Sequence, residues 1–112
     1  MTTIRDSILA APDLTTEPVE IPEWNTTLLV KSMTGADRDQ LEARYSDTGG
    51  VVGLKALIVV LSVVDENGER VFSLSDVEAL QEKSASAIDR VFHVAQRLSH
   101  LLERDMQELA GN

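Results

Sequence analysis

The feature that most constrains the fold is VVGLKALIVVLSVV, residues 51–64, the most apolar run in the chain. Only Gly53, Lys55 and Ser62 interrupt it. An α-helix needs roughly 20 apolar residues to cross a bilayer, so this run is too short and predicts an element buried inside a folded domain. Its valines favour a strand, whereas its length and the LKAL segment favour a helix. The pattern leaves both open, with helix preferred.

Length and charge bound the class of protein. The 112 residues suit one domain, 1–112, and 43% hydrophobic residues are enough for a core. The formal net charge of −9 repels phosphate backbones, so we expect no nucleic-acid binding. The chain has no cysteine, which excludes disulfides, thiolate catalysis and cysteine-ligated zinc, and its first residues lack the layout of a signal peptide. We expect no membrane association.

The N-terminal third predicts a short helix followed by a β-hairpin. Residues 3–11 carry Ile4, Ile8 and Leu9 on one side, and Pro12 ends the helix. Residues 17–33 alternate apolar and charged side chains around a turn at PEW, which predicts a small two-stranded hairpin. Because a lone hairpin is marginal in water, its apolar face must pack on helices.

Helices are predicted from residue 34 to 109. Thr34 and Asp37 form a capping-box pattern that opens a charged helix to about Tyr45, and DENGE at 65–69 is a turn. Ser75 and Glu78 predict a second capping box. The longest helix covers 84–105, and ERDMQELAGN adds a short final one. The predicted class is therefore mainly α with a small hairpin, an α+β fold in which a compact helical domain carries two strands near its N-terminus.

No residue set predicts catalysis. His93 and His100 are seven residues apart, roughly 10 Å along a helix, too far to share one metal ion. DENGE lacks the spacing of a calcium loop, because Gly68 is fourth counting from Asp65. The sequence has no phosphate-binding loop and no nucleophile elbow. We therefore predict a protein that is not an enzyme, without catalytic residues, cofactor or metal.

The predicted helix 84–105 has two contrasting sides. At 100° per residue, one side is apolar and the opposite side is a basic stripe. The apolar side consists of Ile88, Val91, Phe92, Ala95, Leu98 and Leu102, and the basic stripe consists of Arg90, His93, Arg97, His100 and Arg104. The apolar side is best explained as part of the core. The basic stripe is explained equally well by solvated, locally paired charges, such as Asp89 with His93, and by a docking edge for an acidic partner, including another copy of this chain. Trp24 either contacts such a partner or anchors the hairpin.

The order of these segments resembles the tail assembly chaperones of long-tailed bacteriophages, the siphophage tail-chaperone family. The segments that carry the resemblance are IRDSILAAPDL, EIPEWNTTLLVKSMTGADRDQLEARY and LSVVDENGERVFSLSDVEALQEKSASAIDRVFHVAQRLSHL. Together they cover roughly residues 4–109, and none of them is a catalytic signature. The resemblance implies a mostly helical fold with a small hairpin, and it favours helix for residues 53–64.

The resemblance also implies a function. Proteins of this family coat the tape measure protein, a long helical chain, keep it soluble and help recruit the tail tube subunit. The expected partners are therefore the tape measure protein, the major tail protein and further copies of this chain. The expected location is the bacterial host cytoplasm and not the mature virion, and in many relatives a frameshift adds a second domain to some copies. The alternatives are an acidic regulatory or inhibitor module that binds a host protein, and a minor structural tail or connector protein.

Overall fold

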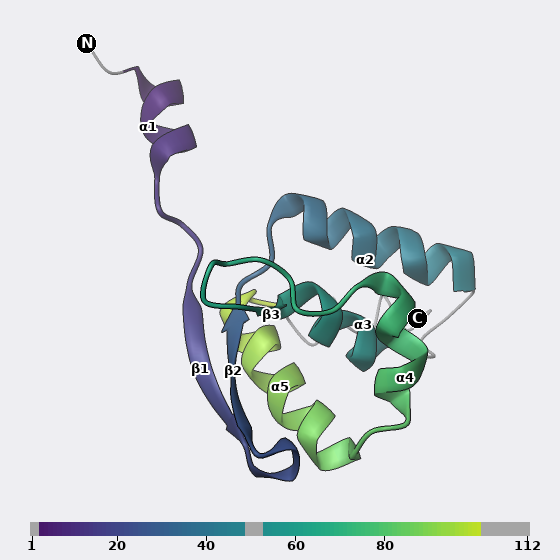
Figure 1. The fold of residues 1–112 in the computed structure, drawn as a ribbon. Coiled ribbons are helices and arrows are strands. Elements are labelled where there is room, and N and C mark those ends of the chain that lie inside the picture. The colour runs from purple at the N-terminus through teal and green to yellow at the C-terminus, as the bar shows by residue number, and fades with distance from the viewer. Residues whose placement is uncertain (1–2, 49–52, 102–112) are drawn as a thin grey trace.

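The computed structural model describes residues 3–48 and 53–101 and shows a three-stranded antiparallel sheet covered by helices (Figure 1). The elements follow the predicted order of a short helix, a hairpin and then helices. The α+β class predicted from the sequence is confirmed. The predicted final helix, together with Leu102 and Arg104, lies outside the described residues.

Helix α3, Leu54–Ser62, occupies the centre of the molecule, and every residue from Ala56 to Ser62 in it is buried. It contacts α2, α4 and α5. Gly53 precedes it with φ of 80°, a left-handed conformation that glycine adopts without the steric cost of a side chain. The helix predicted for the apolar run is confirmed, but the last two residues of the run, Val63–Val64, form strand β3.

The sheet has the strand order β1-β2-β3. Strands β1, Thr16–Ile21, and β2, Thr26–Lys31, form the predicted hairpin around a 3-10 turn, η1, at Pro22–Trp24. Strand β3 pairs with Leu29 and Val30 of β2. The prediction of a two-stranded sheet is therefore wrong by one strand. Only two residues of β3 pair, and they continue an apolar run whose preceding residues are helical, so no alternating pattern marks them.

Local hydrogen bonds define the start of α2, Gly35–Thr48. The backbone N–H of Asp37 donates to Thr34 Oγ1 at 3.0 Å, and the backbone N–H of Thr34 donates to Asp37 Oδ2 at 3.0 Å. The predicted capping box is thus confirmed, and the helix continues three residues beyond Tyr45. Leu41 is its buried contact with the core.

The second capping box lies two residues earlier than predicted. The chain passes through a turn at Asp65–Gly68 into a 3-10 turn, η2, at Leu74–Asp76, and then α4, Val77–Gln81. The backbone N–H of Ser73 donates to Asp76 Oδ2 at 2.9 Å, so Ser73 and Asp76 form the box instead of Ser75 and Glu78. The turn at DENGE is confirmed.

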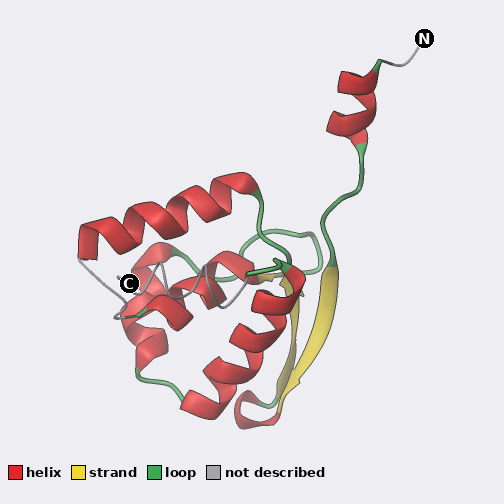
Figure 2. Cartoon of the chain, turned by 180° about the vertical axis from the view of Figure 1, so that it is seen from behind, coloured by secondary structure: helices red, strands yellow, loops and turns green. Residues whose placement is uncertain are grey.

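Helix α5, Ala85–Leu98, lies along the hairpin and separates it from α3 (Figure 2). Ser84 caps its start by accepting from the Ala87 N–H at 3.4 Å. The buried side consists of Ala87, Ile88, Val91, Phe92 and Ala95, in agreement with the predicted apolar side. The prediction that one helix continues to residue 105 is wrong, because α5 ends at Leu98 and His100 turns the chain with φ of 54°.

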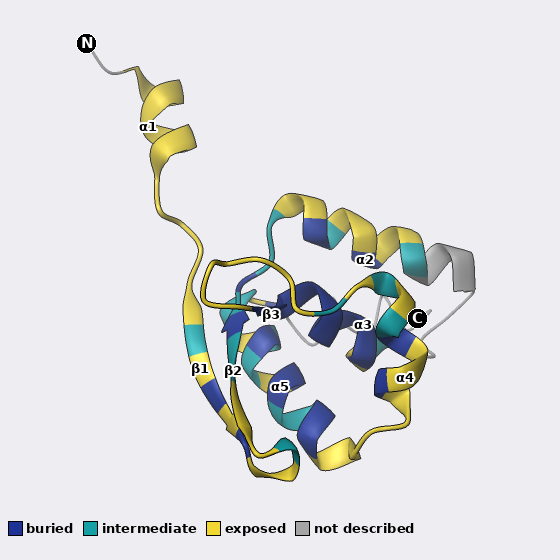
Figure 3. Ribbon diagram, in the orientation of Figure 1, coloured by how far each residue is buried: buried dark blue, intermediate teal, exposed yellow. Residues whose placement is uncertain are grey.

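Helix α1, Ile4–Ala10, stands away from the rest of the molecule on an extended linker, and all of its residues are exposed (Figure 3). Its start is capped by Thr3, whose hydroxyl accepts from the Asp6 N–H at 3.1 Å. The predicted short helix is therefore present. Its apolar side chains do not contribute to the core, because no residue of α1 is buried.

Candidate protein-docking site

The first arginine of the predicted basic stripe is bound to the hairpin. Arg90 on α5 donates to both carboxylate oxygens of Glu23 in η1, Nη1 to Oε1 at 2.5 Å and Nη2 to Oε2 at 3.2 Å. The hydrogen bond from Arg90 lowers the pKa of the Glu23 carboxyl, and the same bond raises the pKa of Arg90. A bidentate contact of this kind fixes the relative orientation of helix and hairpin.

The second arginine of the stripe, Arg97, makes a similar contact with strand β1 of the hairpin. Arg97 Nη2 lies 2.5 Å from Glu17 Oε2 on β1. The side chain of Arg97 keeps 60% of its surface exposed and that of Arg90 keeps 40%. Both arginines thus connect α5 to the hairpin and still present part of each guanidinium to solvent.

Of the other predicted docking residues, His93 shares α5 with these arginines, whereas His100 and Trp24 lie outside that helix. His93 is exposed on α5 and its ring lies 5.5 Å from that of Phe92, centroid to centroid. His100 is exposed but lies beyond the end of α5, so the helical spacing that placed it on the stripe does not apply. Trp24 is half-buried and packs against the core, which places it as an anchor of η1. Arg104 lies outside the described residues.

Most cations of the described residues are neutralised within the chain. Besides Arg97–Glu17, five ion pairs join a cation to a carboxylate of the same chain: Arg5–Asp6, Arg38–Glu42, Lys55–Asp89, Arg70–Asp37 and Arg90–Glu23. Lys31 and Lys83 have no ion-pair partner among residues 3–48 and 53–101. The described surface therefore has isolated cations and no extended basic patch of the kind that nucleic-acid binding requires.

Asp37 combines two roles in one carboxylate. Burial raises its pKa, but the hydrogen bonds from the Thr34 N–H and from Arg70 outweigh burial, so the pKa lies below its ordinary value. Arg70 also donates to Gln40 at 2.8 Å. Asp37 thus caps α2 and fastens the loop that contains Arg70 to the same helix.

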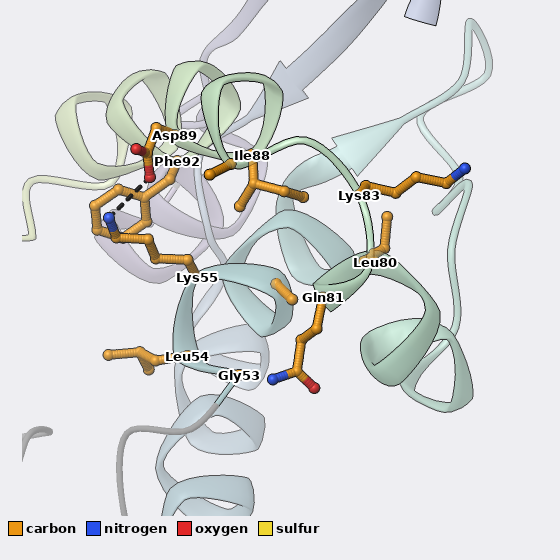
Figure 4. A pocket seen from close by; sticks show the side chains of 11 residues that line it. Gly53, Leu54, Lys55, Leu80, Gln81, Lys83, Ile88, Asp89 and Phe92 are labelled. Atoms are coloured by element: carbon orange, nitrogen blue, oxygen red, sulfur yellow. Dashed lines mark hydrogen bonds and ion pairs between the residues drawn. The ribbon is translucent and has the colours of Figure 1, made fainter. Parts of the chain in front are cut away.

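An apolar groove lies between α3, α4 and the first half of α5 (Figure 4). Its volume is about 520 Å³. The apolar residues that line it are Leu54, Ala56, Leu80, Ala85, Ile88 and Phe92. Lys55 and Lys83 add positive charge, and the Lys55 ammonium is held 2.8 Å from Asp89 Oδ1 and 5.2 Å from the centre of the Phe92 ring. The groove has the composition of a site for an apolar side chain or helix face and offers no set of groups for a reaction.

The described residues contain neither a metal-binding cluster nor a membrane-spanning helix. Within residues 3–48 and 53–101, no group of three His, Asp or Glu side chains could hold a metal ion. None of the helices described is long and apolar enough to cross a membrane.

The groove was missed in the sequence because its walls come from three separate helices. Leu54, Leu80 and Phe92 each occupy an ordinary apolar position of a separate helix. An indirect signal was available in the short helix at residues 4–10. Its three large apolar side chains are exposed in the folded chain, which indicates that an apolar surface exists for them to pack against.

No protein-family model matches the sequence, and no curated protein matches it either. A solved structure does match, described as "Structure of bacteriophage HK97 tail assembly chaperone". The match has a TM-score of 0.64 at 15% sequence identity and covers 88% of this chain and 96% of the other. The two chains share a fold. This phage tail assembly chaperone-like fold agrees with the resemblance seen in the order of the sequence segments, and the likeness extends over nearly the whole of both chains.

Proposed function

We propose that the protein is a tail assembly chaperone that binds the tape measure protein of a long-tailed phage or prophage, keeps it soluble and helps recruit tail tube subunits. The observation that supports this most is the fold shared with the tail assembly chaperone of bacteriophage HK97 over 88% of the chain. On this proposal the protein acts in the bacterial host cytoplasm, has no catalytic role and is absent from the finished particle.

The physical properties of the chain fit this function. A protein that covers a long apolar client must remain soluble when loaded, and a net charge of −9 favours solubility. The described surface carries an apolar groove and partly exposed arginines, which suit contact with another protein.

The experiment is co-purification of the tagged full chain from cells that also express the neighbouring genes, with bound proteins identified by mass spectrometry. We expect recovery of a very long helical protein that is soluble only when this chain is co-expressed. Recovery of a host protein without a long partner would instead support an acidic regulatory or inhibitor module. Recovery of neither, with the chain found in purified particles, would support a structural tail or connector protein.

The predicted docking edge, with Arg90, His93, Arg97, His100, Arg104 and Trp24 as its residues, belongs to this proposal, and Arg90 and Arg97 are the arginines of it that can be tested on the described helix α5. The test must distinguish a role of the stripe in binding a partner from the role of its arginines in the ion pairs with the hairpin. The double variant Arg90→Glu with Glu23→Arg keeps an ion pair between α5 and η1 but moves the positive charge onto the hairpin. If Arg90 docks an acidic partner, this variant folds normally and loses client binding. If it retains client binding while Arg90→Glu alone loses stability, the arginine serves the fold only.

A matched control is available on the hairpin. Lys31→Glu makes the same change of charge as Arg90→Glu alone, at a cation on β2 that has no ion-pair partner among residues 3–48 and 53–101. It should leave both the fold and client binding unchanged. A loss as large as that of Arg90→Glu alone would mean that total charge, and not the position of Arg90, controls binding.

A further inference from the structure

Helix α1 is an apolar helix without a partner in its own chain. Ile4 and Ile8 lie one turn apart on the same side, and Leu9 lies beside Ile8. Their exposed fractions are 81%, 63% and 69%. With only seven residues, α1 is far shorter than a helix that is stable alone in water, so it needs a surface to pack against.

The groove between α3, α4 and α5 is the complementary feature. A cavity of about 150 Å³ admits a molecule of the size of benzene, so a groove of about 520 Å³ has room for more than one aliphatic side chain. Its lining is mainly apolar, and the described residues leave it open to solvent. Exposed aliphatic side chains on α1 and an open, mainly apolar groove thus occur in one molecule without meeting.

The charges around the two features also match. Lys83, at the rim of the groove, has no ion-pair partner among the described residues. The segment around α1 contributes Asp13, which likewise has none within residues 3–48 and 53–101, whereas Arg5 and Asp6 pair with each other. The approach of the Asp13 carboxylate to the Lys83 ammonium would favour register and association rate, while Asp89 in the groove lining is already paired with Lys55.

The position of the arm favours a second copy over its own chain. The Thr15 N–H donates to Ser32 Oγ at 3.0 Å and the Ser32 N–H donates to the Thr15 carbonyl at 2.8 Å, so the arm is free only before Thr15. It leaves the hairpin at the end away from η1 and points outward, whereas α3, α4 and α5, whose residues line the groove, lie on the other side of the hairpin (Figure 1). To reach its own groove, the four-residue linker 11–14, with a span of at most about 14 Å, would have to reverse and stretch across the hairpin.

We propose that α1 of one copy docks its Ile4 and Ile8 side into the α3–α4–α5 groove of a second copy. The contact is heterologous, because it joins different surfaces on the two copies, and each copy keeps a free groove or a free arm for the next. Repetition of this contact gives a ring or an open chain of copies. The inference rests on the chain alone and does not depend on the proposed client.

The test uses the purified full chain in sedimentation velocity over a wide range of concentrations. Wild type should form dimers and larger species as concentration rises. Ile8→Gln removes the apolar contact from the arm while keeping a good helix former, and Ala85→Glu places an acidic side chain at the lip of the groove, in the first turn of α5 where acid is tolerated. Each variant should weaken association at least ten-fold.

Matched controls lie close in sequence. Ala10→Gln makes the same substitution on α1 two residues along, about 200° around the helix from Ile8. Ser86→Glu adds the same charge to the first turn of α5 at a residue that does not line the groove. Both controls should associate as wild type does, and circular dichroism should show the same fold for all four variants.

The decisive step is to mix the two defective variants. The Ile8→Gln chain retains its groove and the Ala85→Glu chain retains its arm, so a 1:1 mixture should form a heterodimer and nothing larger. Three results would overturn the proposal: a wild type that stays monomeric, controls that lose as much association as the test variants, or a mixture that does not associate. If the chain stays monomeric and its arm is protected from solvent at every concentration, α1 docks on its own chain. If the chain stays monomeric and Ile8 is needed only for binding a client, α1 docks on a different protein.

Discussion

Two serines, Ser62 in the core and Ser99 outside it, give opposite predictions for the same substitution. Ser62, the last residue of α3, is completely buried, and its hydroxyl has no hydrogen-bond partner among the described residues. Ser99 is half-buried, and its hydroxyl accepts from the Met33 N–H at 2.9 Å. Replacement of each by alanine removes one oxygen, but only one of these oxygens makes a hydrogen bond.

The magnitude follows from those environments. A buried polar group without a partner costs about 1–3 kcal/mol, and alanine at Ser62 removes that cost while leaving a small void. We expect Ser62→Ala to raise the free energy of unfolding by about 1 kcal/mol, or the midpoint temperature by about 4 °C. Ser99→Ala leaves the Met33 N–H without its acceptor, so we expect a loss of about 1 kcal/mol.

The assay is urea unfolding followed by circular dichroism and by Trp24 fluorescence, with the two probes required to coincide. The slope against urea should be the same for both variants and wild type, because neither changes the surface exposed on unfolding. If Ser62→Ala were neutral or destabilising, the hydroxyl would have a partner in solution, such as a buried water, and the reasoning would be refuted.

Two further predictions concern single side chains. The folded-state pKa of Asp37 lies below its unfolded value, so its contribution to stability is fully present above about pH 4 and is lost as pH falls through the lower folded-state pKa. Asp37→Asn, which also weakens the contact with Arg70, should cost about 1 kcal/mol at pH 7 and flatten the stability curve below pH 4 in acid titrations followed by circular dichroism. Gly53→Ala should cost about 1–2 kcal/mol in urea unfolding, because φ is 80° and the new Cβ would lie 3.3 Å from Gln81, whereas Gly35→Ala, with nothing within 4 Å, should not destabilise the protein.

Local interactions were predictable from the sequence. Thr34 and Asp37 are three residues apart, so the pattern itself contains both partners of the capping box. The second box shows the limit of this approach, because SLSDVE fits both Ser73 with Asp76 and Ser75 with Glu78. The sequence pattern does not discriminate between the two, and the choice depends on how the preceding loop enters η2.

Contacts between distant segments were not predictable. Strand β3 exists because Val63 and Val64 pair with Leu29 and Val30 of β2, and two valines at the end of an apolar run show no alternation that would separate a strand from the helix before them. Similarly, the ion pair between Arg90 and Glu23 joins residues 67 apart in the sequence. The stripe was predicted from helical spacing alone, so its interruption after Leu98, where neither glycine nor proline ends the helix, was also missed.

The measurement that most directly tests the proposed chaperone function is deletion of the gene from the phage or prophage that encodes it. Particles should be counted by electron microscopy and their proteins identified by mass spectrometry. We expect filled heads without tails, tails restored when the chain is supplied from a plasmid, and no trace of the chain in the restored particles. Normal tails in the deletion, or stoichiometric amounts of the chain in purified particles, would contradict it.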